Sequence, residues 1–131
     1  MIFQSLRRDN SGAASVEMAL TLPILLTFIY GIFQLGVILA ANAGMQHALG
    51  EGARYATIFP TPTNSQIATR ITDKKFGVHV GTWGTPVVTD AVTPATGYKD
   101  LSISYSVTPN FLFFNGPVIS WTRTKRVYVS I

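Results

Sequence analysis

The feature that most constrains this chain is a long uncharged stretch that begins directly after Glu17. No Asp, Glu, Lys or Arg occurs between Met18 and Gly50. Its apolar part, Met18 to Ala41, is longer than the ~20 residues that a helix needs to span the hydrocarbon core of a bilayer. A carboxylate at the boundary of such a segment is costly, and it is usually kept for a function. The sequence therefore predicts a transmembrane helix over residues 13–41 with a functional acid near its start.

The overall composition agrees with a membrane anchor. Of the 131 residues, 47% are hydrophobic and 12% are charged, about half the charged share of a typical soluble domain. One small core cannot cover this much apolar side chain, so a membrane or a partner has to cover the rest. The net charge is +4, but the basic residues are dispersed, so a nucleic-acid partner is not expected. The absence of cysteine excludes disulfides and thiolate chemistry.

The residues before the apolar stretch predict its orientation. Arg7 and Arg8 give the head a mild positive charge, and the positive-inside tendency places such a head in the cytoplasm. Residues after about 42 would then lie on the opposite side, because no second span follows. A secretory signal peptide cut at residues 41–43 (Ala-Asn-Ala) is the less favoured alternative, since the apolar segment is longer than a signal core. A twin-arginine export signal is also disfavoured, because an acid and an amide follow the arginine pair.

The helix is expected to continue beyond the membrane segment. Small and apolar residues recur on one side at helical spacing, and this set comprises Met45, Leu49, Gly52, Ala53 and Ala56. Pro60 and Pro62 would end the helix. Residues 42–59 are therefore predicted to be an extramembrane continuation, and a helix from Ala13 to about Thr57 would be roughly 67 Å long.

Residues 60–131 are expected to form a small external domain. Thr63 and Gln66 predict a capping box at the start of a short helix over residues 64–76. Strict alternation predicts a strand whose buried face comprises Leu101, Ile103, Tyr105 and Val107. A second strand is predicted over residues 121–131, and weaker ones over 78–80 and 86–92.

These elements predict an α+β fold. The alternation of apolar and polar residues indicates an antiparallel sheet with one buried and one wet face. Such a sheet has to cover an apolar surface, and the outer half of the long helix offers one. The apolar loop Phe111–Phe114 has three alternatives: it enters the membrane surface, contacts another subunit, or folds under the sheet as a satellite core.

Catalysis is not expected from this chain. Besides Glu17, its acids are scattered along the sequence: Asp9, Glu51, Asp73, Asp90 and Asp100. His47 and His79 fall in different predicted elements, and no spacing resembles a metal site. Phosphate-binding, dinucleotide-binding and nucleophile-elbow motifs are missing from the sequence. We therefore expect neither an enzyme nor a cofactor.

Two short segments carry a family resemblance. The first is Gly12-Ala13-Ala14-Ser15-Val16-Glu17, directly before the apolar run, and the second is Glu51-Gly52-Ala53-Arg54-Tyr55-Ala56. Together they resemble the TadE-like proteins, which are minor pilins or pseudopilins of the bacterial tight-adherence (Tad/Flp) pilus machinery. The resemblance covers residues 7–57. Met18 stands where the family often has Phe or Tyr.

The resemblance implies a pilin-like fold and a specific assembly role. A prepilin peptidase would cut between Gly12 and Ala13 and release the cytoplasmic leader, residues 1–12. The new amine of Ala13 would pair with Glu17 of its own or a neighbouring chain. Implied partners are the prepilin peptidase, other pilins and minor pilins, an inner-membrane assembly platform and the lipid bilayer. The implied location is the bacterial inner membrane, with incorporation into a pilus left open.

Two other hypotheses remain beside this one. The chain could be an unprocessed single-pass membrane protein whose external domain binds a partner. It could also be a secreted binding domain that starts near Gly44 after cleavage by signal peptidase.

Overall fold

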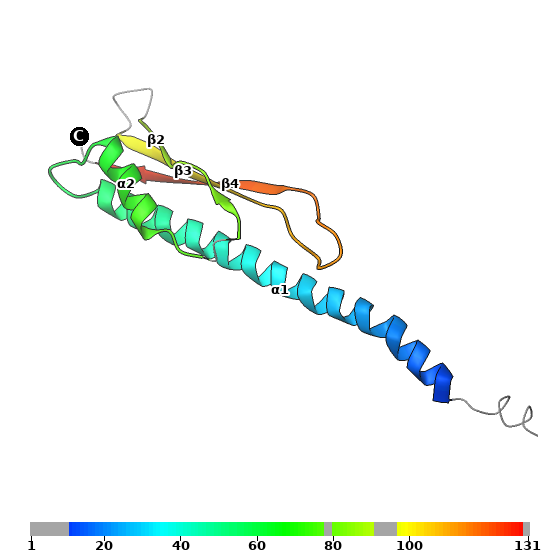
Figure 1. Cartoon of the computed structure of the whole chain (residues 1–131). Coiled ribbons are helices and arrows are strands. Elements are labelled where there is room, and N and C mark those ends of the chain that lie inside the picture. The colour runs from blue at the N-terminus through cyan, green and yellow to red at the C-terminus, as the bar shows by residue number, and fades with distance from the viewer. Residues whose placement is uncertain (1–10, 78–79, 91–96, 130–131) are drawn as a thin grey trace, which may run out of the picture.

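The computed structural model describes residues 11–77, 80–90 and 97–129. It contains two helices and four strands (Figure 1): α1 (Ser11–Ala56), α2 (Asn64–Lys74), β1 (Thr82–Trp83), β2 (Val87–Asp90), β3 (Tyr98–Val107) and β4 (Ile119–Tyr128). The predicted α+β fold is confirmed. Most of the weak strand predicted over residues 78–80 lies outside the described residues.

Helix α1 is one continuous helix of 46 residues that contains Pro23. Two hydroxyl groups bond back to the helix backbone around this proline. Thr21 Oγ1 donates to the carbonyl of Glu17 at 2.8 Å, and Thr27 Oγ1 donates to the carbonyl of Pro23 at 2.8 Å. The helix is long and apolar enough to cross a membrane. It ends at Ala56, one residue before Thr57 and three residues before the end of the continuation predicted over residues 42–59.

Helix α2 begins at the predicted capping box. The Gln66 amide donates to Thr63 Oγ1 at 3.3 Å, and the Thr63 amide donates to Gln66 Oε1 at 2.9 Å. The apolar stripe of this helix, Ile67 and Ile71, is fully buried. The helix ends two residues earlier than predicted, because Lys75 already has an extended backbone.

Strand β3 is the centre of the sheet. Its whole length pairs antiparallel with β4, from Tyr98 opposite Tyr128 to Val107 opposite Ile119. Its other edge pairs with the short strands β1 and β2, one after the other. The predicted alternation in β3 is confirmed, since Leu101, Ile103, Tyr105 and Val107 are buried and the intervening serines are partly exposed.

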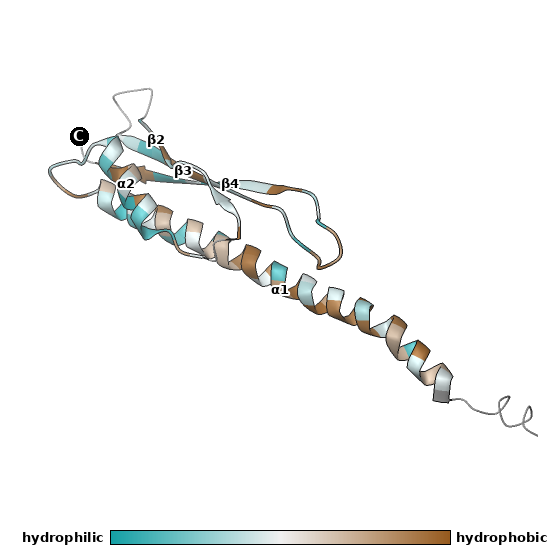
Figure 2. Cartoon of the chain, viewed as in Figure 1, coloured by the Kyte–Doolittle hydropathy of each residue, from teal (hydrophilic) through white to brown (hydrophobic). Residues whose placement is uncertain are grey.

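The core lies between the sheet, α2 and the outer half of α1. Its buried apolar residues are Ala41, Met45, Ala48, Leu49, Ala53, Ala56, Ile67, Ile71, Leu101, Ile103, Tyr105, Val107 and Val127. The sheet and α2 lie along one half of α1, and the other half projects away from them (Figure 1). Hydrophobic residues predominate along this projecting half, whereas α2 is largely hydrophilic (Figure 2).

The apolar loop between β3 and β4 lies beside α1. A Cβ at Gly31 would lie 3.4 Å from Phe111 Cε1, which is ordinary van der Waals contact, so the phenyl ring lies against this position of the helix. Phe111 is partly buried, but Leu112, Phe113 and Phe114 are all exposed. Of the three alternatives for this loop, a satellite core therefore describes only Phe111.

Candidate functional site

The predicted processing and pairing residues lie at the start of α1. Gly12, Ala13 and Glu17 are all exposed and helical. A Cβ at Gly12 would meet no atom of the described residues within 4 Å, and Gly12 has no positive φ. Neither packing against the described residues nor backbone conformation thus requires glycine at this position. Arg7 and Arg8 lie outside the described residues.

The spacing of Ala13 and Glu17 places them on one face of α1. Residues four apart are one helical turn apart, so their groups can meet on the helix surface. An amine created at Ala13 would therefore lie within reach of the Glu17 carboxylate. In the intact chain the Ala13 nitrogen is an amide, and the pairing stays a prediction.

The segment that follows presents apolar side chains on all sides. Every residue from Gly12 to Leu26 is exposed. The large apolar members of this surface include Val16, Met18, Leu20, Leu22, Ile24 and Leu25. A helix that is apolar all round needs a membrane or other helices around it. This part of α1 can thus bind lipid and, after assembly, neighbouring helices.

The predicted motif Glu51–Ala56 lies where α1 docks on α2. Glu51 Oε2 lies 3.4 Å from Arg70 Nη2 of α2, and Glu51 Oε1 lies 3.8 Å from Arg54 Nη1. The guanidinium of Arg70 also lies 6.0 Å from the ring centroid of Tyr55. These partly exposed contacts contribute little individually, but they orient α2 on α1.

The small residues of the same motif allow close packing. A Cβ at Gly52 would collide with the side chain of Ile71. Ala53 and Ala56 are buried in the core next to it. The six-residue motif therefore makes two kinds of contact with α2: the ion pair of Glu51 with Arg70 and the close packing of Gly52 on Ile71. Both contacts hold the external domain on the helix.

Sequence reasoning missed another close contact of α1. A Cβ at Gly44 would overlap the backbone carbonyl of Phe76, in the segment after α2. The His47 ring also packs on Phe76, with ring centroids 5.4 Å apart. The only signal in the sequence was the small size of residue 44 on the buried side of the helix.

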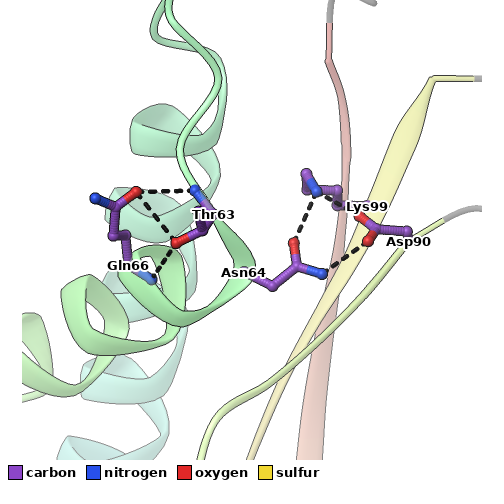
Figure 3. Close-up of polar contacts among 5 residues, drawn as sticks. All are labelled: Thr63, Asn64, Gln66, Asp90 and Lys99. Atoms are coloured by element: carbon purple, nitrogen blue, oxygen red, sulfur yellow. Dashed lines mark hydrogen bonds and ion pairs between the residues drawn. The ribbon is translucent and has the colours of Figure 1, made fainter.

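A polar cluster at the far end of the domain was also missed. Asn64 Nδ2 donates to Asp90 Oδ2 at 2.8 Å, Lys99 Nζ donates to Asn64 Oδ1 at 2.7 Å, and Lys99 also pairs with Asp90 (Figure 3). The hydrogen bonds from Lys99 and Asn64 lower the pKa of the Asp90 carboxyl. Because the three residues come from α2, β2 and β3, the cluster joins the helix to the sheet.

A second charge pair joins the central strand β3 to its neighbour β4. Arg126 Nε donates to Asp100 Oδ1 at 2.8 Å, and Arg126 Nη2 donates to Asp100 Oδ2 at 2.9 Å. The guanidinium lies 4.1 Å from the ring centroid of Tyr98. The hydrogen bonds from Arg126 lower the pKa of Asp100. Across the described ranges, no group of three or more His, Cys, Asp or Glu side chains could hold a metal ion.

The fold and the site define a class of protein. Within the described residues, it combines a helix that is long and apolar enough to cross a membrane with a small α+β domain packed on the outer half of that helix. Residues 12–54 match the family model of the TadE-like proteins. This match confirms the predicted TadE-like family over that segment, and it implies a protein associated with the Tad pilus. No curated protein and no solved structure matches the chain.

Proposed function

We propose that this chain is a minor pilin or pseudopilin that acts in the assembly of a Tad (Flp) pilus. The observation that carries the proposal is the exposed, mostly apolar surface from Ala13 to Leu26, which begins directly after a glycine and contains a single acid, Glu17. Such a surface is suited to lipid before assembly and to neighbouring subunits afterwards. The TadE-like match over residues 12–54 supports the same role.

In this proposal a prepilin peptidase cleaves between Gly12 and Ala13. The helix is anchored in the bacterial inner membrane, with residues 1–12 in the cytoplasm and the α+β domain outside. One observation supports the cleavage site. Among the described residues, nothing in the packing of Gly12 explains the glycine.

Glu17 would then pair with the amine that cleavage creates at Ala13. Opposite charges attract far more strongly at the low dielectric of a helix bundle than in water. A buried charge without a partner is strongly penalised, so only the paired register would be stable. The pair would therefore fix the axial position of the chain when its helix moves from lipid into the assembly.

The chain itself is proposed to have no catalytic role and no cofactor. Its partners would be the peptidase, other pilins and minor pilins of the Tad machinery, and the inner-membrane assembly platform. The external domain would be displayed at the pilus or at its membrane base.

The cleavage is tested by the mass of the mature N-terminus. In a host that contains the peptidase, mass spectrometry should find a chain that begins at Ala13. The Gly12→Val variant should remain a full-length precursor. The matched control is Gly36→Val, because a Cβ at Gly36 also meets no described atom within 4 Å. An intact Met1 on functional wild-type protein would favour the unprocessed single-pass alternative.

The same measurement tests the secreted alternative, which predicts a start near Gly44. The fold argues against it, because cleavage there would remove Val37 and Ala41, which are 3% and 0% exposed. Loss of these residues would open the core that holds the domain on the helix.

The charge pair is tested by substitution of Glu17. Glu17→Ala and Glu17→Gln should both still be cleaved, and both should abolish incorporation into pili or their base, measured by immunoblotting of sheared pili. Glutamine keeps the size and polarity of the side chain and removes only the charge. Normal assembly of Glu17→Gln would refute the pairing.

A further inference from the structure

The loop between β3 and β4, residues 108–118, forms the tip of the β3–β4 hairpin and is rich in exposed apolar side chains. It lies beside the part of α1 that we propose spans the membrane. We infer that this hairpin tip inserts into the outer leaflet of the same membrane and acts as a second anchor for the domain. The inference rests on the membrane-spanning role proposed for α1.

The composition of the hairpin tip suits lipid. The chain carries no charged residue between Leu101 and Thr122. The exposed apolar side chains of the tip are Leu112 (53%), Phe113 (65%), Phe114 (59%) and Val118 (69%). Exposed apolar clusters of this kind usually mark a contact with a partner or a membrane.

Several backbone groups of the tip are satisfied by its own residues. The Phe111 amide donates to the carbonyl of Phe114 at 2.8 Å, and the Gly116 amide donates to the carbonyl of Pro109 at 2.7 Å. The Leu112 amide donates to Asn110 Oδ1 at 2.9 Å. Unpaired backbone groups are the main cost of placing an irregular segment in lipid, and these bonds reduce that cost.

The position of the tip along α1 sets its depth. Phe111 packs on Gly31, which is about 20 Å along the helix axis from Met18 at 1.5 Å per residue. The hydrocarbon core of a bilayer is ~30 Å thick. With Glu17 at the inner boundary, Gly31 lies inside the outer leaflet, and the tip lies at the same level.

The first charged side chain of β4 lies at the level along α1 where the hydrocarbon core would end. Arg123 Nε of β4 donates to Asn42 Oδ1 of α1 at 2.8 Å. Asn42 is about 36 Å along the helix from Met18, beyond the ~30 Å hydrocarbon core. The first cation of β4 would therefore lie in the headgroup region, and the uncharged end of the hairpin would lie below it.

The surface around the tip is continuous with the lipid-facing surface of α1. The tip and α1 enclose an apolar groove of about 410 Å³, which Phe28, Gly31, Ile32, Leu35 and Phe111 help to line. Phe28, Ile32 and Leu35 are themselves exposed. Lipid that surrounds this part of α1 would also meet the tip, so we assign lipid, rather than a second copy, as its occupant.

The test places single cysteines in the full-length, naturally cysteine-free chain. Phe113→Cys is labelled with an environment-sensitive fluorophore and reconstituted in phosphatidylcholine vesicles. Ile24→Cys reports whether α1 itself lies in lipid. Phe59→Cys is the matched control, because Phe59 is 90% exposed and lies after the far end of α1.

The expected result is a label on the Phe113→Cys variant that lipid-borne nitroxide quenches several-fold more strongly than aqueous iodide. The label on Phe59→Cys should show the reverse order, and the label on Ile24→Cys should behave like that on Phe113→Cys. If iodide quenches the label on Phe113→Cys while the label on Ile24→Cys stays protected in lipid, insertion of the tip would be refuted and the membrane span of α1 would stand. Protection of the tip label that disappears on dilution into excess lipid would show a second copy instead. Iodide quenching of the α1 label would contradict the membrane span itself.

Discussion

The two halves of α1 are one helix built for two environments. From Gly12 to Leu26 every residue is exposed, and large apolar side chains point in all directions. From Gln34 onward the buried positions recur every three or four residues, at Val37, Ala41, Met45, Ala48, Gly52 and Ala56. The inner half therefore depends on its surroundings, whereas the outer half is covered by its own domain.

Side-chain size separates the two roles of the helix. The buried face of the outer half is rich in glycine and alanine, which let the sheet and α2 approach the helix closely. The inner half has Leu, Ile and Phe on every side, which suits lipid or interdigitation with other helices. One helix can thus serve as both anchor and spine without a break at Pro23.

The largest expected effect on the free energy of unfolding comes from replacing a buried methionine. The chain offers a matched comparison, because each half of α1 contains one methionine. Met45 is 0% exposed and Met18 is 62% exposed. Met45→Ala should destabilise the domain by about 2–5 kcal/mol, because it removes a buried side chain and leaves a cavity. Met18→Ala should change the free energy of unfolding by less than about 0.5 kcal/mol, as for other exposed sites.

Denaturant titration in detergent micelles measures both variants. The two tryptophans, Trp83 and Trp121, both pack on Tyr105 and report unfolding of the domain by fluorescence. Equal effects of the two methionine substitutions would contradict the conclusion that the domain covers only the outer half of α1.

A second prediction concerns close approach in the outer half. Gly44→Ala should cost about 1–3 kcal/mol, because its Cβ would overlap the backbone carbonyl of Phe76, which cannot rotate away. Gly50→Ala is the matched control, since its Cβ would meet only Lys125 Nζ at 3.8 Å. The control should be neutral or slightly stabilising, because alanine favours helix. The same fluorescence titration compares them, and a neutral Gly44→Ala would refute the close contact.

The smallest expected effect is on the acid stability of the outer domain. Hydrogen bonds from Lys99 and Asn64 hold the pKa of Asp90 below its ordinary value of 3.8. The stabilisation is therefore fully present above the unfolded pKa near ~3.9, and it is lost as the pH falls through the lower folded pKa. It is small, because the Asp90 side chain is 59% exposed and solvent screens the pair. Unfolding titrations between neutral and acid pH should show a shallower acid loss for Asp90→Asn. An unchanged slope would contradict this role.

Local sequence patterns predicted most of the fold. The apolar run and the recurrence of small residues predicted α1, and Thr63 with Gln66 predicted the start of α2. Alternation at Leu101 to Val107 predicted the buried face of the central strand. Each of these signals lies within a few residues of the element that it specifies, so no knowledge of the tertiary structure is needed.

The contacts that fix the domain on the helix could not be predicted in the same way. Gly44 meets Phe76, Asn64 meets both Asp90 and Lys99, and Gly31 meets Phe111. These partners are far apart in sequence, and only the folded chain brings them together. The motif Glu51–Ala56 was identified by resemblance alone, and its role in docking α2 became evident only from the contacts of Glu51 and Gly52.

The part of α1 before Asn42 is proposed to lie in a membrane, and the part from Asn42 onward is proposed to lie outside it. The most direct test is labelling of single cysteines in intact native membranes by a water-soluble maleimide. We predict that Gln46→Cys and Arg54→Cys, both exposed in the outer half, react promptly once the reagent reaches the external side. Ile24→Cys and Phe28→Cys, equally exposed on the isolated chain, should react only after detergent dissolves the membrane. Equal reactivity of all four in intact membranes would contradict the account.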